Sequence, residues 1–185
     1  FLLSQNPIAI PGVSNAEMLR LALSEKENKN IPIFEFNQKM EHICKMLDIP
    51  KSFIHRSIND GMSGGERKKN ELLHLWMLDP KLIILDELDS GLDVDSLKIV
   101  CESLRKYYEE HKCSILIISH HPEVLKLLNA TNVHILSSGK IVKSGDISLA
   151  DKIEKDEYNN CYSNETKKPN YYLDTTENIF KKCLE

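Results

Sequence analysis

The stretch Leu82-Ile83-Ile84-Leu85-Asp86-Glu87 decides the fold, because a run of four apolar residues ends directly in two carboxylates. Consecutive apolar positions are typical of a strand in a parallel sheet, where both faces are covered. Two ionised carboxylates after a buried strand cost desolvation free energy unless a cation compensates their charge. The stretch therefore predicts Asp86 and Glu87 at the tip of a core strand, beside a metal ion.

A second stretch, Met62-Ser63-Gly64-Gly65-Glu66, predicts a turn that opens a helix. Backbone N–H groups at a helix N-terminus favour a phosphate, so the two stretches together resemble half of an ATP-hydrolysing site. The phosphate-binding motif Gly-x-x-x-x-Gly-Lys-Ser/Thr does not occur in these residues. The nearest string, Ser138-Gly139-Lys140-Ile141, lacks the hydroxyl that would ligate magnesium and is predicted to lie in a hairpin.

Composition indicates one globular domain with a substantial core, since 41% of the 185 residues are hydrophobic and 28% are charged. A net charge of −4 argues against nucleic acid as the partner. No apolar run reaches the length of about 18 residues that a membrane-spanning helix needs. Five cysteines without a Cys-x-x-Cys pair do not form a disulfide framework. Cys101 and Cys113 lie in apolar surroundings and are interpreted as core residues rather than cluster ligands.

The first half of the chain predicts three helices. Ser14-Asn15-Ala16-Glu17 is a capping box that opens a helix through Leu23, and a solvated loop is expected from Glu25 to Pro32. Apolar residues at helical spacing predict a second helix that stops before Ile49-Pro50. The third is expected from Gly64 to Leu78, with Asp79-Pro80 after it. The spaced apolar residues of the second helix are Phe36, Met40, Ile43 and Leu47.

The second half alternates strands and helices, which predicts an α/β layered core with a parallel sheet. Strands are expected at Leu82 to Leu85 and Ile115 to Ile118, and a short helix at Pro122 to Leu128. Ser137-Ser138-Gly139 predicts a hairpin between Val133 to Leu136 and Lys140 to Val142. A helix between the strands is marked by Leu97, Val100, Cys101, Leu104 and Tyr108. Beyond about Ile153 the composition becomes polar, and residues 156–185 are predicted to be a mobile extension.

These motifs, in this order, resemble those of the ATP-binding-cassette (ABC) ATPases. The resemblance implies their P-loop fold: residues 1–155 would be a partial ABC ATPase domain, with a helical subdomain at about 14–78 and the catalytic core at 79–150. The Walker A region would lie upstream of Phe1. The matching motifs are the Q-loop at Gln5, the signature at Ser63-Gly64-Gly65-Glu66, the Walker B end at Asp86-Glu87, the D-loop at Ser90 to Asp93 and the switch histidine at His120.

The sequence between the shared motifs is similar to that of the SufC branch, the ATPases of Suf iron-sulfur cluster assembly. The strings that carry this likeness are Ile10-Pro11-Gly12-Val13-Ser14-Asn15, Arg56-Ser57-Ile58-Asn59-Asp60-Gly61, Glu66-Arg67-Lys68-Lys69-Asn70-Glu71 and Gly139-Lys140-Ile141-Val142-Lys143-Ser144-Gly145-Asp146. Two positions depart from that pattern. His121 stands where tyrosine is usual, and Leu88 stands where a small hydroxyl residue is common.

The resemblance implies a role for each motif residue around ATP and Mg²⁺. Asp86 would position the metal through its water shell, and Glu87 would polarise the attacking water. Gln5 would contact the metal and this water and couple the nucleotide to a partner surface. His120 would donate a hydrogen bond to the γ-phosphate.

The signature would act in trans. Ser63, Gly64, Gly65 and Glu66 would contact a nucleotide bound by a second ATPase head, and Asp93 would communicate across that interface. The resemblance therefore implies a transient dimer that forms on ATP binding.

Three functions remain open at this point. The first is the ATPase of a Suf assembly complex, acting with SufB- and SufD-like scaffold proteins. The second is the nucleotide-binding subunit of an ABC transporter, and the third is a binding module without hydrolysis. Twenty lysines against four arginines are typical of AT-rich genomes such as those of apicomplexan parasites. Together with that composition, the Suf resemblance implies a plastid-type organelle (apicoplast), with a cytoplasmic location as the alternative.

Overall fold

The computed structural model describes residues 1–137, 139–154 and 170–174. The chain divides into two compact units, one made of residues 1–5 and 81–185 and the other of residues 6–80. Each unit has its own set of secondary-structure elements. Among the described residues, no helix combines the length and the apolar character needed to cross a bilayer.

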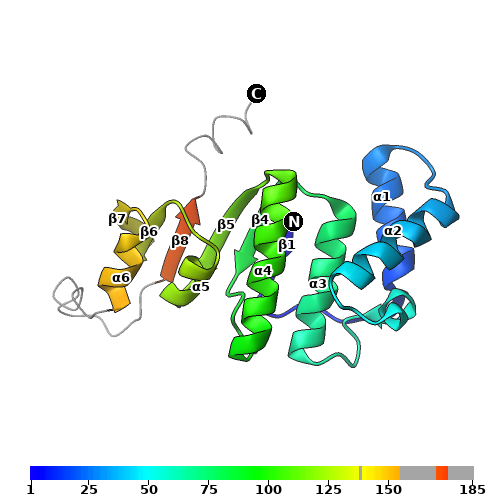
Figure 1. Ribbon diagram of the computed structural model, residues 1–185, viewed down its shortest axis with the longest axis horizontal. Helices are drawn as coiled ribbons and strands as arrows, with labels where there is room; N and C mark the ends of the chain where they lie inside the picture. The colour runs from blue at the N-terminus through cyan, green and yellow to red at the C-terminus, as the bar shows by residue number, and fades with distance from the viewer. Residues whose placement is uncertain (138, 155–169, 175–185) are drawn as a thin grey trace. The chain divides into compact units, whose positions relative to one another are not determined.

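The sheet unit carries a six-stranded sheet (Figure 1) with the strand order β1-β4-β5-β8-β6-β7. Its strands are β1 (Leu2–Leu3), β4 (Leu82–Asp86), β5 (Ser114–Ser119), β6 (Val133–Ser137), β7 (Lys140–Gly145) and β8 (Asn170–Asp174). β1, β4 and β5 pair in parallel. β8 pairs antiparallel with both β5 and β6, and β6 and β7 form an antiparallel hairpin.

Three helices of this unit, α4 (Val94–His111), α5 (Pro122–Leu127) and α6 (Ser148–Glu154), lie on one side of the sheet (Figure 1). The apolar residues of the central strands β4 and β5 are not equally buried. Ile83 and Leu85 are fully buried, whereas Ile84, Leu116 and Ile118 keep intermediate exposure. Within the described residues, alternate positions of these two strands are therefore less buried than the positions between them.

The helical unit contains α1 (Asn15–Glu27), α2 (Ile33–Met46), the 3₁₀ helix η1 (Lys51–His55), α3 (Gly64–Leu78) and the two-stranded pair β2 (Ile10–Ser14) and β3 (Ser57–Ile58). The capping box at Ser14 and Glu17 is confirmed, with both reciprocal hydrogen bonds present. The buried positions Leu19, Met40 and Leu73 supply one apolar residue from each helix to the core of this unit.

Local patterns predicted most boundaries, and the exceptions have physical reasons. α1 continues to Glu27, so the polar residues from Glu25 onward are partly helical; a left-handed Asn28 then ends the helix. On α4, Tyr107 is fully buried while the predicted Tyr108 is 39% exposed. Residues 170–174 form β8, so the prediction of a mobile extension is wrong there; residues 155–169 and 175–185 lie outside the described part of the chain.

Candidate functional site

Glu87 lies between two of the predicted site residues. Parallel strands end at the same edge of a sheet, so the segments that follow β1, β4 and β5 converge there. Gln5 Nε2 donates a hydrogen bond to Glu87 Oε2. His120 Nδ1 lies 3.5 Å from the other carboxylate oxygen, Glu87 Oε1. Residues that are 82 and 33 positions from Glu87 in the sequence are thus brought to one carboxylate.

The backbone of Glu87 holds this carboxylate in a strained turn. Glu87 has a φ of 45°, in the left-handed region that side chains with a Cβ disfavour. Its N–H donates to the Ile118 carbonyl at 2.9 Å, and its own carbonyl accepts from the N–H of Ser90 at 3.0 Å. Both hydrogen bonds compensate the strain and turn the chain sharply at the end of β4. Strain of this kind is concentrated at functional sites.

Asp86, the last residue of β4, is half-buried next to Glu87. Its carboxylate and the amide oxygen of Gln5 are hard oxygen donors, which is the chemistry that Mg²⁺ prefers. Since Gln5 turns its NH₂ group toward Glu87, its carbonyl oxygen stays available as an acceptor. The residues at this edge therefore fit Mg²⁺.

The signature residues begin α3 in the helical unit. Ser63 is the N-cap: its Oγ accepts from the Glu66 N–H, and Glu66 Oε2 accepts from the Ser63 N–H at 2.8 Å. Arg56 Nη1 lies 3.1 Å from Glu66 Oε1. The backbone hydrogen bond from Ser63 and the contact with Arg56 lower the pKa of Glu66. The capping box therefore keeps Glu66 ionised and leaves the exposed Ser63 and Gly64 at the surface.

Asp93 is the N-cap of α4 and accepts hydrogen bonds from the N–H and the hydroxyl of Ser96, at 2.7 and 3.1 Å. These hydrogen bonds lower the pKa of its exposed carboxyl. Asp93 thus has a local structural role in addition to the predicted role at an interface.

The structure places Gln5, Asp86, Glu87, Asp93 and His120 in the sheet unit and the signature residues in the helical unit. The functional assignments of these residues remain predictions. The interpretation of Cys101 and Cys113 as core residues agrees with their surroundings. Burial raises the pKa of the Cys101 thiol to about 12, and Cys113 is buried as well.

Sequence reasoning missed Asp89 as a partner of the histidine pair. His121 Nε2 lies 3.3 Å from Asp89 Oδ2, and Asp89, His120 and His121 form one compact group of possible ligands. The signal was present, because Asp89 follows β4 and the two histidines follow the neighbouring parallel strand β5. Asp89 immediately precedes the D-loop match at Ser90 to Asp93 and is not part of any of the family motifs.

Comparison with known proteins agrees with this fold. A model of the ABC transporter family matches residues 2–90. The dimeric structure of the bacterial ABC transporter cassette MJ0796 superimposes with a TM-score of 0.67, at 19% identity, over 79% of this chain and 62% of that one. At that identity the likeness concerns the fold alone.

Three curated relatives show how far the similarity in sequence extends. The iron-sulfur cluster assembly protein SufC of Plasmodium falciparum is 43% identical over 162 residues, which are 85% of this chain and 46% of that protein. The probable ATP-dependent transporter SufC of Escherichia coli (strain K12) is 40% identical over 85% of this chain and 65% of its own length. The probable ATP-dependent transporter ycf16 of Trieres chinensis is 40% identical, with 85% and 64% covered.

Fold and matches together show that the chain has the P-loop fold of the ABC-type ATPases. More narrowly, the chain is a homologue of the SufC/ycf16 ATPases over 85% of its length. It spans only 44% to 65% of the length of the curated relatives that it matches.

Proposed function

We propose that this chain is part of the ATPase subunit of a Suf iron-sulfur cluster assembly complex. The observation that carries the proposal is the contact of Gln5 and His120 with the two oxygens of the Glu87 carboxylate. Those three residues are the parts that a water-activating site needs, and two of the curated relatives bear the name SufC. In this proposal ATP is the substrate and Mg²⁺ its metal ion.

Each residue has a task in the proposed reaction. Glu87 orients the attacking water and accepts its proton, because its carboxylate is the base at the end of β4. Gln5 and His120 hold the carboxylate from both sides, and His120 donates a hydrogen bond to the transferred phosphate. Mg²⁺, when bound through Asp86 and Gln5, would neutralise the charge of the phosphate oxygens.

Hydrolysis requires a second ATPase head in this proposal. Ser63, Gly64, Gly65 and Glu66 present a helix N-terminus to the nucleotide of the partner copy, and Asp93 lies at the interface. ABC cassettes form dimers, as the structure of MJ0796 illustrates.

We propose SufB- and SufD-like scaffold proteins as partners. Closure of the two ATPase heads would rearrange these scaffold proteins. Their surface on this chain would be the helical unit. α1 exposes Leu21, and α2 exposes Ile33 and Phe34, at 66%, 62% and 72% of their surfaces. Large apolar side chains at this exposure favour a protein partner. We place the complex in a plastid-type organelle, with the cytoplasm as the alternative.

The test is to purify the full-length gene product and its Glu87→Gln variant from native lysate, and to measure ATPase activity and co-purifying proteins for both. We expect Mg²⁺-dependent ATPase activity that falls at least about 10²-fold in the variant, because Gln cannot accept the proton. SufB- and SufD-like proteins should co-purify with both forms. Co-purification with a membrane protein instead would assign the chain to an ABC transporter. Absence of both activity and partners would contradict the proposal.

A further inference from the structure

We propose that Asp89, His120 and His121 form a site for a transition-metal ion of the Zn²⁺ class, distinct from the Mg²⁺ position at Asp86. One possible ligand atom from each of the three residues lies within 4.8 Å of the other two. Ligands bind zinc at about 2.0–2.2 Å in a tetrahedral arrangement, so two ligand atoms of one ion lie about 3.3–3.6 Å apart. His121 Nε2 and Asp89 Oδ2, at 3.3 Å, already have this separation, and the His120 ring would have to move closer to complete the set.

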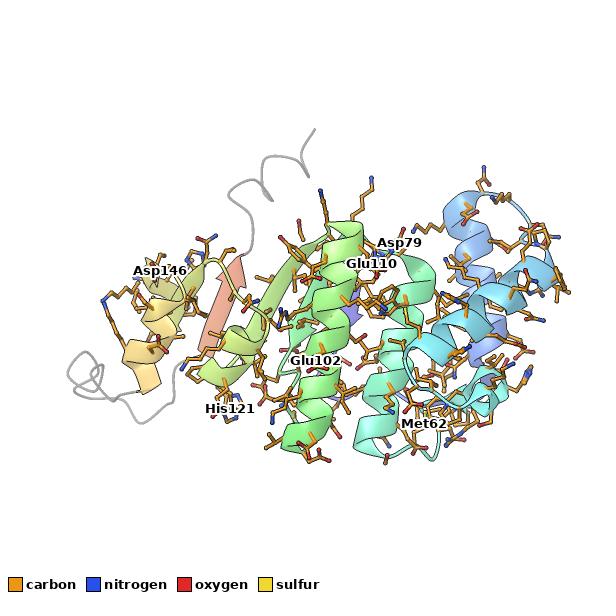
Figure 2. The ribbon with its side chains drawn as sticks, in the orientation of Figure 1. Met62, Asp79, Glu102, Glu110, His121 and Asp146 are labelled. Carbon is orange, nitrogen blue, oxygen red and sulfur yellow. The ribbon has the colours of Figure 1, made fainter. Side chains whose placement is uncertain are left out.

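The two histidines lie side by side although they are neighbours in the sequence. Their ring centroids are 4.0 Å apart, with the planes tilted by 47°. Neighbouring residues of a continuing strand would point to opposite faces, but β5 ends at Ser119 and the chain turns into α5. Figure 2 labels His121, which immediately precedes α5. Because of this turn, the imidazole rings of His120 and His121 lie next to each other instead of on opposite faces of a strand.

Ser119 organises the carboxylate of the group. Its hydroxyl donates to Asp89 Oδ1 at 3.3 Å and accepts the N–H of His121 at 3.0 Å. The other carboxylate oxygen, Asp89 Oδ2, is directed to His121 Nε2 at 3.3 Å. The Asp89 side chain is mostly buried, with 12% of its surface exposed, so its position is restricted. Hydrogen bonds that orient a ligand in this way support metal binding.

The donor set selects the class of ion. Two imidazoles and one carboxylate suit Zn²⁺, Co²⁺ or Ni²⁺, whereas Mg²⁺ and Ca²⁺ prefer oxygen alone. Three protein ligands leave a fourth position for water. A histidine ligand commonly donates its other ring nitrogen to a carboxylate, and Glu87 Oε1 lies 3.5 Å from His120 Nδ1.

An ion at this site would hold His120 away from its task in hydrolysis. A ring bound to the metal cannot donate the same hydrogen bond to phosphate, so Zn²⁺ would inhibit the ATPase. This consequence rests on the proposed function, whereas metal binding itself does not.

The test is a calorimetric titration of the full-length gene product with Zn²⁺, repeated with Co²⁺ and read by its visible absorption. We expect one tight site in the parent protein. His121→Phe keeps a ring beside His120 but removes a ligand, so Zn²⁺ should bind at least about tenfold more weakly. His134→Ala is the matched control, since His134 lies on β6 beside Ser144. It should bind Zn²⁺ as the parent does.

A second variant and a second measurement make the result decisive. His121 is exposed, so His121→Gln should fold even if the Phe variant does not, and it should show the same weakening. Submillimolar Zn²⁺ should inhibit the parent ATPase but not the His121 variants. Equal Zn²⁺ affinity in parent and His121 variants, or loss of the site in His134→Ala, would overturn the proposal. If the parent shows no ATPase activity, the proposed function fails while the titration still decides the metal site.

Discussion

Glu87 combines a charged side chain with a backbone conformation that favours glycine. Its φ of 45° is retained because two hydrogen bonds, to Ile118 and from Ser90, fix the turn. The conformation is a cost to stability that places a carboxylate between Gln5 and His120. A residue selected for stability alone would be glycine at this position.

Comparison of Glu87→Gly with Glu87→Ala tests this strain. Both variants remove the carboxylate, so the lost contacts cancel in the difference. The Gly variant should be more stable than the Ala variant by about 1 kcal/mol, because only Ala has a Cβ that strains a left-handed residue. Chemical denaturation of the full-length protein measures the difference. Equal stabilities would show that Glu87 does not hold the left-handed conformation in solution.

A buried polar network joins the elements of the helical unit. Asn70 Nδ2 donates to Asn15 Oδ1 and to Asn59 Oδ1, both at 3.1 Å. Asn15 Nδ2 donates to the Phe53 carbonyl, which identifies its Oδ1 as an acceptor. His74 Nε2, 2.6 Å from that oxygen, therefore carries the proton of a neutral ring. The network links α1, η1 and α3 and specifies how they pack.

His74 makes the stability of the helical unit depend on pH. Burial lowers its pKa from 6.5 to about 4. The unfolded chain thus binds a proton between about pH 6.5 and pH 4 that the folded chain does not, so stability falls as the pH falls through this range. The loss approaches about 3 kcal/mol near pH 4.

Denaturation of parent and His74→Gln proteins across this pH range measures the effect. Gln can still donate to Asn15 but does not titrate, so the variant should lose less stability on acidification. The exposed His42→Gln is the matched control and should behave as the parent does. Identical pH dependence in the parent and the His74 variant would contradict a buried neutral imidazole.

The sheet as a whole is completed by a strand from the far end of the chain. β8 lies antiparallel between β5 and β6, where Tyr172 is paired with Ile118 on one side and His134 on the other. A strand with neighbours on both sides uses its backbone N–H groups in the ladders. β8 therefore connects the part of the sheet that carries Glu87 and His120 with the β6–β7 hairpin.

Tyr172→Pro and Tyr172→Ala should differ in stability if this pairing forms in solution. Both remove the tyrosine side chain, but only proline lacks the N–H and cannot join a central strand. The Pro variant should be less stable than the Ala variant by about 2 kcal/mol, because one hydrogen bond of the ladder is left unmade. Thermal unfolding of the full-length protein provides the measurement. No difference between the two variants would exclude the central position of β8.

The sequence alone determined the features that depend on neighbouring residues. The capping boxes at Ser14 and Ser63, the bounds of α3, the apolar strands that carry Asp86 and precede His120, and the β6–β7 hairpin all follow from local patterns. The family motifs also identified Gln5, Glu87 and His120 as candidates. Local hydrogen bonding and side-chain periodicity act within a few residues, so a linear sequence displays them.

Only the tertiary structure decided which distant groups meet. It brought Gln5 and His120 to opposite oxygens of Glu87, placed Asp89 beside the histidine pair, and inserted β8 antiparallel between β5 and β6. The physical reason is that strand order and register are set by packing over long separations, which no local pattern encodes.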